Sequence, residues 1–204
     1  MQRSTRIQPS QERQKPRLLL AVFVGVLLFC VLITQRAAIR EHQLYFTEPR
    51  RSVAFELSDL TEEWSEATLR ERFPDIPPNC EGISEPGLGD VVCVLDTKSF
   101  NGVPALFISF FFASGRLQQV SINVPWWRHQ AARDYLDTSL GEPSASQIFP
   151  HSGVRLHGWR LSNGAAVFYN RDMSINPLEW NAIYWQSASL CARAGCFTAR
   201  RARS

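Results

Sequence analysis

The chain has 204 residues, of which 45% are hydrophobic and 11% aromatic, so it can bury the core of one domain and still carry additional segments. The net charge of +3 arises near the N-terminus, where the residues up to Arg40 include seven basic residues and one acidic residue. The rest of the chain has fifteen basic and eighteen acidic residues. Because a nucleic-acid-binding body is normally basic itself, no nucleic-acid partner is expected.

Residues 18–35 form an uncharged and almost entirely apolar run. As a helix this run is about 27 Å long, at the short end of what crosses a hydrocarbon core of about 30 Å. We predict a transmembrane helix over 18–35 that contacts the lipid bilayer. A cleaved signal peptide fits less well, because Gln35 or Arg36 would stand at position −3 of the cut. A lipoprotein signal also fits poorly, because Phe29 and not a small residue precedes Cys30.

Basic residues on either side of this run predict its orientation. Arg13, Lys15 and Arg17 crowd the N-terminal side, whereas Arg36 and Arg40 on the far side are sparser. The expected organisation therefore begins with a cytoplasmic basic tail and ends outside the cytoplasm. Its parts are the tail 1–17, the helix 18–35, a linker 36–54, an extracytoplasmic domain 55–198 and a second basic tail 199–204.

Four cysteines follow the apolar run, and all would lie on one side of the membrane: Cys80, Cys93, Cys191 and Cys196. Pairing neighbours in sequence closes two short loops, and each such disulfide stabilises by about 2–3 kcal/mol in the loop-entropy treatment. Free buried thiols and a four-cysteine zinc site are the alternatives, although the spacings are not the tight pairs typical of structural zinc. Disulfides imply an oxidising compartment, which agrees with the orientation that the basic residues predict.

The domain pattern predicts an α+β fold with two helices. The first covers the stretch "LSDLTEEWSEATLRERFPDIPP", begins near Asp59 and ends before Pro74. The second covers "PWWRHQAARDYLDTSLGEP", opens at Pro125 and ends at Gly141.

About three strands follow each helix. The stretch "DVVCVLDT" predicts one strand, and two hairpins turn at Ser114-Gly115 and Asn163-Gly164. The stretch "EWNAIYWQS" predicts a last strand, and Cys191 to Cys196 would fold back as a small loop. The order predicts a repeat of αβββ units, about 57–124 and 125–196, as one antiparallel sheet with both helices on one face.

The helix endings "LRERFPDIP" and "LDTSLGEP", each leading into strands, resemble small bacterial envelope domains. These are the β-lactamase-inhibitor-like fold and the outer-membrane-assembly lipoproteins that share it. The resemblance covers about two-thirds of the chain and implies a protein-binding role. It transfers no functional residue, and the chain departs from those lipoproteins because it has no suitable cysteine to acylate. The expected location is the bacterial inner membrane, single pass, with the C-terminal domain in the periplasm.

The first hairpin carries apolar residues on both faces. A two-residue turn at Ser114-Gly115 pairs Phe107 with Ile122, which places Ala105, Phe107 and Phe111 in the core. The other face would carry Leu106, Ile108, Phe110 and Phe112, which we take as candidate partner-binding residues. A one-residue change in the register of the turn would exchange the two sets. Two readings stay open for this face: it is covered from within the chain, or it forms a groove for a partner.

Known catalytic motifs are absent from the sequence. The histidines after the apolar run are His129, His151 and His157; the last two could approach each other, but two histidines with no nearby carboxylate make a poor metal site. No cofactor, metal or catalytic residue is expected. The sequence predicts a membrane-anchored envelope assembly or accessory factor that binds a protein partner and is not an enzyme. The alternatives are an enzyme acting on envelope polymer or peptide, and an immunity or inhibitor protein.

Overall fold

The computed structural model describes residues 14–84, 87, 89–148, 154–173, 176 and 180–197. The chain divides into two compact units, Met1–Gln43 and Leu44–Ser204. The first unit contains helix α1 (Gln14–Thr34) and most of helix α2 (Arg36–Thr47). The second unit contains all the strands, and we call it the domain.

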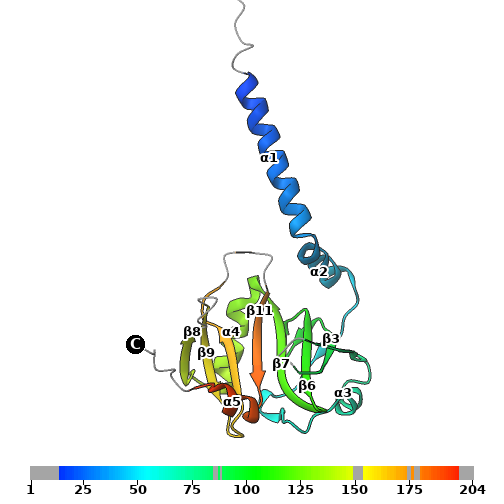
Figure 1. Ribbon diagram of the computed structural model, residues 1–204, viewed down its shortest axis with the longest axis vertical. Coiled ribbons are helices and arrows are strands. Elements are labelled where there is room, and N and C mark those ends of the chain that lie inside the picture. The colour runs from blue at the N-terminus through cyan, green and yellow to red at the C-terminus, as the bar shows by residue number, and fades with distance from the viewer. Residues whose placement is uncertain are drawn as a thin grey trace, which may run out of the picture. The chain divides into compact units, whose positions relative to one another are not determined.

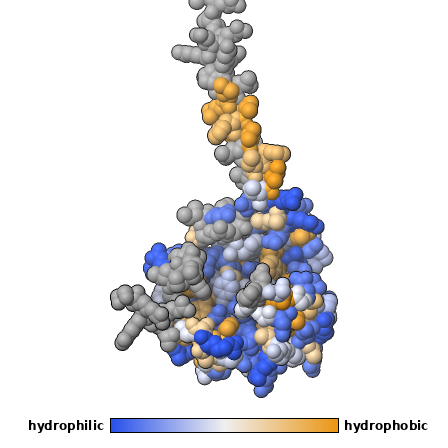
Figure 2. All heavy atoms as spheres, viewed as in Figure 1, coloured by the Kyte–Doolittle hydropathy of each residue, from blue (hydrophilic) through white to orange (hydrophobic). Residues whose placement is uncertain are grey.

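Helix α1 exposes apolar side chains that no other described residue of its unit covers. Figure 2 shows them in orange, in contrast to the largely polar surface of the domain. The large ones that are at least half exposed are Leu19, Leu20, Val22, Phe23, Val26, Phe29 and Ile33.

Among the described residues, no helix combines the length and the apolar character that crossing a membrane requires. The prediction of a transmembrane helix over 18–35 is therefore wrong as a description of this fold. The uncharged run of eighteen residues is shorter than the about 20 residues that span a hydrocarbon core.

An eight-stranded antiparallel sheet forms the centre of the domain, in the order β2-β3-β6-β7-β11-β10-β9-β8 (Figure 1). The α+β class and the antiparallel sheet are confirmed. The strands are β2 (Asn79–Gly82), β3 (Val91–Asp96), β6 (Phe107–Ala113), β7 (Arg116–Pro125), β8 (Ala145–Ile148), β9 (Arg155–Arg160), β10 (Ala166–Asn170) and β11 (Trp180–Gln186). A smaller sheet contains β1 (Ser52–Val53), β4 (Ser99–Phe100) and β5 (Val103–Pro104).

The large sheet has two halves of the same element order. Helix α3 (Glu66–Arg72) precedes β2, β3, β6 and β7, and helix α4 (His129–Leu140) precedes β8 to β11. The halves join where the last strand of each, β7 and β11, pair with one another. The predicted unit of one helix and three strands is thus corrected to one helix and four strands of this sheet. The missed strands, β2 and β8, are the short edges, which carry no apolar alternation.

The first predicted helix begins later than its sequence suggests. Leu57–Asp59 forms one 3₁₀ turn, and α3 starts only after Ser65, whose hydroxyl accepts the N–H of Thr68. The segment between them turns at Glu62 and Glu63, where the N–H of Trp64 donates to the carbonyl of Thr61, and it buries Leu60 and Trp64 in the core. Asp59 therefore caps no long helix, and the predicted start is wrong. The second predicted helix is confirmed: a 3₁₀ turn over Trp126–Arg128 leads into α4, which ends at Gly141.

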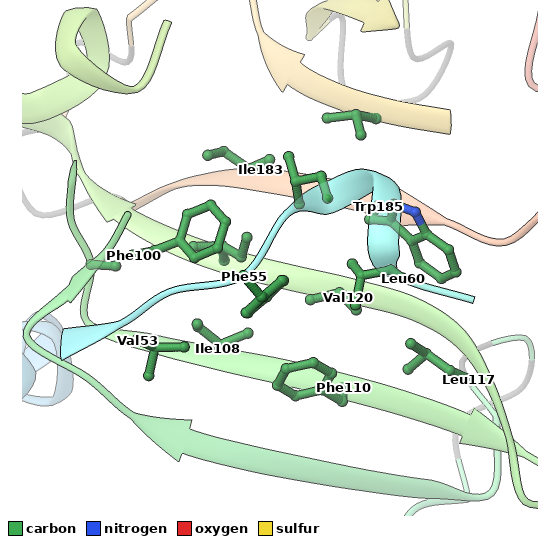
Figure 3. Packing of buried hydrophobic residues seen from close by; sticks show 14 of the residues in the cluster. Val53, Phe55, Leu60, Phe100, Ile108, Phe110, Leu117, Val120, Ile183 and Trp185 are labelled. Carbon is green, nitrogen blue, oxygen red and sulfur yellow. The ribbon is translucent and has the colours of Figure 1, made fainter. Parts of the chain in front are cut away.

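The main core lies on the sheet face that α4 and the segment 53–72 cover (Figure 3). Phe110 is fully buried there, with Trp64 stacked 6.4 Å away and Phe55 at 6.1 Å between ring centroids. Ile183 and Trp185 of β11 and Val120 of β7 extend this core across both halves of the sheet. The two helices therefore pack on the same face, as predicted from the sequence.

The first hairpin has a β-bulge that the sequence did not predict. Ala113 does pair with Arg116, but the register shifts between Phe111 and Phe112, so that Ile108 and not Phe107 faces Ile122. The shift moves alternate residues to the other face. Phe107 and Phe111 are half-buried on the face opposite the main core, and the predicted core set is wrong for both.

A second, smaller core lies on the opposite face of β9, β10 and β11. Helix α5 (Ala188–Ala194) and the residues up to Phe197 cover this face, where Cys191 and Cys196 pack with Leu156, Ala166 and Phe168. The rings of Phe168 and Phe197 stack with centroids 5.6 Å apart. The predicted C-terminal loop is therefore a short helix with a packed end.

Candidate functional site

Both predicted disulfides form, between Cys80 and Cys93 and between Cys191 and Cys196. The first joins directly paired residues of β2 and β3, and the second closes the end of α5. A four-cysteine zinc site is thereby ruled out as a description of this fold, because each sulfur is bonded to another. Cys30, in α1, is free and exposed.

The four candidate partner-binding residues lie in the interior. Leu106 is 2% exposed, Phe112 is 1% exposed, and Ile108 and Phe110 are fully buried. The bulge places Ile108, Phe110 and Phe112 in the main core. The prediction that they lie on an open apolar face and bind a partner is therefore corrected. Of the two readings that the sequence left open, coverage from within describes these side chains.

Two histidines of the domain, His129 and His157, lie against aromatic rings. His129 is buried at the start of α4 and stacks on Tyr169, with centroids 5.0 Å apart, and His157 of β9 lies 6.3 Å from Trp159. Burial lowers the pKa of both, so each favours the neutral form. His151 lies outside the described residues.

A cleft of about 290 Å³ opens where four segments of the domain meet. These are the segment that begins at Leu60, the start of β7, the β9–β10 turn and the segment from the end of β11 to the start of α5. The lining residues are Leu60, Thr61, Glu62, Glu63, Arg116, Asn163, Ala165, Trp185 and Ala188. The sequence does not reveal this site, because the residues that line it are spread over more than 120 positions.

Glu62 holds three of these segments together. Its backbone carbonyl accepts the N–H of Leu117, one carboxylate oxygen accepts the N–H of Ser189 at 2.8 Å, and the other lies 3.5 Å from the Arg116 guanidinium. Burial alone would raise the pKa of Glu62, but the Ser189 hydrogen bonds and the charge of Arg116 outweigh it and leave the pKa below its ordinary value. Glu62 therefore contacts the first turn of α5.

Asn163 closes the other side of the cleft. Its amide group donates to the carbonyl of Leu60 and its side-chain oxygen accepts the N–H of Ala165. The β9–β10 turn is therefore fixed to the segment that carries Glu62. The cleft rim is rigid on both sides, which reduces the entropy that a ligand would have to overcome on binding.

Trp185 is the buried aromatic residue among those that line the cleft. Its side chain is 1% exposed, and the indole N–H has no hydrogen-bond partner among the described residues. An unpaired buried N–H costs about 1–3 kcal/mol; because this nitrogen has almost no accessible surface, the cost belongs to the folded state and the N–H offers no contact to a ligand. Arg116, with 62% of its side chain exposed, and the exposed Glu63 add one charge of each sign at the rim.

The low pKa of Glu62 predicts a pH-dependent contribution to folding. A carboxyl whose pKa is lower in the folded state stabilises that state fully above its unfolded pKa, near the ordinary value of 4.5. The stabilisation disappears as the pH falls through the lower folded pKa. We therefore expect Glu62→Gln to be less stable than wild type at pH 7 and to have the same stability as wild type in strong acid.

Urea unfolding at several pH values measures this difference in stability. Glu63→Gln, at an exposed neighbouring carboxylate, is the control. A constant gap between wild type and Glu62→Gln from pH 7 to pH 2 would contradict the assignment.

The chain matches no protein-family profile, no curated protein and no solved structure.

Proposed function

We propose that this protein is an extracytoplasmic envelope factor whose domain binds a polypeptide segment of a partner protein in the cleft beside Glu62. The observation that carries the proposal is the cleft itself, whose rim carries the exposed charges of Arg116 and Glu63. A polypeptide supplies carbonyl acceptors for Arg116 and N–H donors for Glu63. The site therefore fits binding through backbone groups and one or two charged side chains.

The disulfides support an extracytoplasmic location. Both lie in the domain, and such bonds persist in oxidising compartments such as the bacterial periplasm. The proposed location is the outer side of the bacterial inner membrane.

The exposed apolar surface of α1 supports association with a lipid bilayer. Leu20 and Phe23 are 63% and 66% exposed, and an apolar surface of this kind is normally covered by lipid or protein. The proposed partners are thus a bilayer, contacted through residues 18–35, and a protein of the cell envelope.

Site-specific photocrosslinking in cells tests the cleft. A benzophenone amino acid at Glu63, on the rim, is expected to give a discrete adduct, whereas the same group at Glu142, exposed beyond α4, gives none. Arg116→Ala is expected to remove the Glu63 adduct without changing the unfolding temperature of the protein by more than a few degrees. Adducts that are identical at both positions, or an adduct that persists in Arg116→Ala, would overturn the proposal.

A further inference from the structure

Phe46, Trp127 and Trp180 form a row of aromatic rings at one end of the domain, which we call the aromatic row. The rings of Phe46 and Trp127 stack with centroids 6.0 Å apart, and Trp127 lies 6.2 Å from Trp180. Phe46 is 65% exposed and Trp127 is 40% exposed, whereas aromatic residues of the main core such as Phe100, Phe110 and Trp185 are buried. Exposed aromatic rings that contact one another form a continuous apolar patch, and such patches on folded domains mark interaction sites.

Cationic groups accompany this row. The ammonium of Lys98 lies 4.2 Å from the centroid of the Tyr45 ring and 5.9 Å from that of Phe46, and it donates to the carbonyl of Tyr45. Arg128, next to Trp127, is exposed, and its positive charge acts against the rise that burial causes in the pKa of Tyr45. Rings with a cation beside them suit the boundary between acyl chains and anionic headgroups.

The row is also held rigidly. Tyr45, the neighbour of Phe46 in α2, is 5% exposed, and its hydroxyl donates to the carbonyl of Lys98 at 3.1 Å. Trp127 lies in the 3₁₀ turn that follows β7, and Trp180 begins β11, which pairs with β7. The rings of the row are therefore attached to the last turn of α2, to the turn after β7 and to the start of β11.

Chain length limits how far this row can lie from α1. Phe46 follows the last residue of α1, Thr34, by twelve positions, and a chain of that length reaches at most about 40 Å even when fully extended. If α1 associates with a bilayer, the row is always within reach of the same bilayer.

We propose that the aromatic row docks the domain on the surface of the bilayer with which α1 associates, its rings entering the headgroup region beside Lys98 and Arg128. This inference rests on the proposed association of α1 with lipid. It adds a second, independent point of lipid contact, and it assigns the row to lipid and not to a protein partner.

All six tryptophans of the chain lie beyond residue 63, so tryptophan fluorescence reports on the domain and not on α1. The full chain is reconstituted with phosphatidylcholine–phosphatidylglycerol vesicles whose acyl chains are brominated near the headgroup, and with unbrominated vesicles as the reference. We expect weaker emission in the brominated vesicles, because bromine quenches only rings that touch lipid. Trp127→Phe is expected to remove most of that difference.

A pair of charge variants supplies the matched control. Phe46→Asp is expected to reduce the quenching, whereas Ala192→Asp, exposed on α5 beyond the opposite end of β11, leaves it unchanged. Flotation of the chain with vesicles is measured in the same samples and reports on α1. A chain that floats but shows equal emission in both lipids overturns the docking of the row and leaves the association of α1 intact. A chain that does not float contradicts both.

Discussion

Phe110→Ala is expected to lower the free energy of unfolding by about 3–5 kcal/mol, the usual loss when a buried phenylalanine is truncated in a core that cannot collapse around the cavity. Phe110 is fully buried between Trp64 and Phe55, so several ring contacts disappear at once. Urea unfolding followed by circular dichroism measures the change.

Phe111→Ala is the matched control for this prediction. Phe111 is the next residue of β6, has the same side chain, and is only half-buried on the opposite face. Its truncation is expected to cost less than half as much. If Phe111→Ala were the more destabilising substitution, Phe111 and not Phe110 would lie in the main core. That result would contradict the bulge and agree with the register predicted from the sequence.

Replacing Cys80 and Cys93 together with alanine is expected to cost about 2–4 kcal/mol of unfolding free energy. The bond closes a loop with a sequence separation of 13 and fixes the edge strand β2 to β3. Alanine at position 93 leaves no polar group in the core, where Cys93 is fully buried.

The control for the disulfide is Cys30→Ala, which removes the free cysteine of α1 and is expected to leave the unfolding of the domain unchanged. Wild-type protein treated with a reductant should lose stability by about as much as the double variant or more, since the reductant also opens Cys191–Cys196. Unchanged stability in the double variant would mean that β2 needs no covalent tie.

The sequence predicts the elements whose signals are local. The hairpin turns at Ser114-Gly115 and Asn163-Gly164 and the end of α4 at Gly141 all follow from residues that stand next to one another. The two disulfides were also predictable, because each joins the nearest cysteine in sequence.

The hairpin register was not predictable, because contacts from a distant segment accompany the bulge. The backbone carbonyl of Gln118, the extra residue of β7, accepts the N–H of Ser187 at 2.9 Å. The side-chain oxygen of Gln118 accepts from Arg193 at 2.8 Å and from Ser189. These partners lie about 70 positions along the chain, and no pattern within "ALFISFFFASGRLQQV" reveals them.

The candidate site was hidden for the same reason. Glu62 reads as an ordinary acidic residue near a helix start, yet the helix it contacts, α5, begins more than 120 residues later. In the sequence Trp185 is one of several aromatic residues on a strand, and only the fold shows that its N–H is buried with no hydrogen-bond partner in the described part of the chain.

The central claim is that the domain folds with its four cysteines oxidised, outside the cytoplasm. Cells are lysed under denaturing, non-reducing conditions with iodoacetamide, and the intact mass of the protein is measured. Two disulfides and a free Cys30 predict one alkyl group per chain. Five alkyl groups per chain would contradict both the pairing and the compartment.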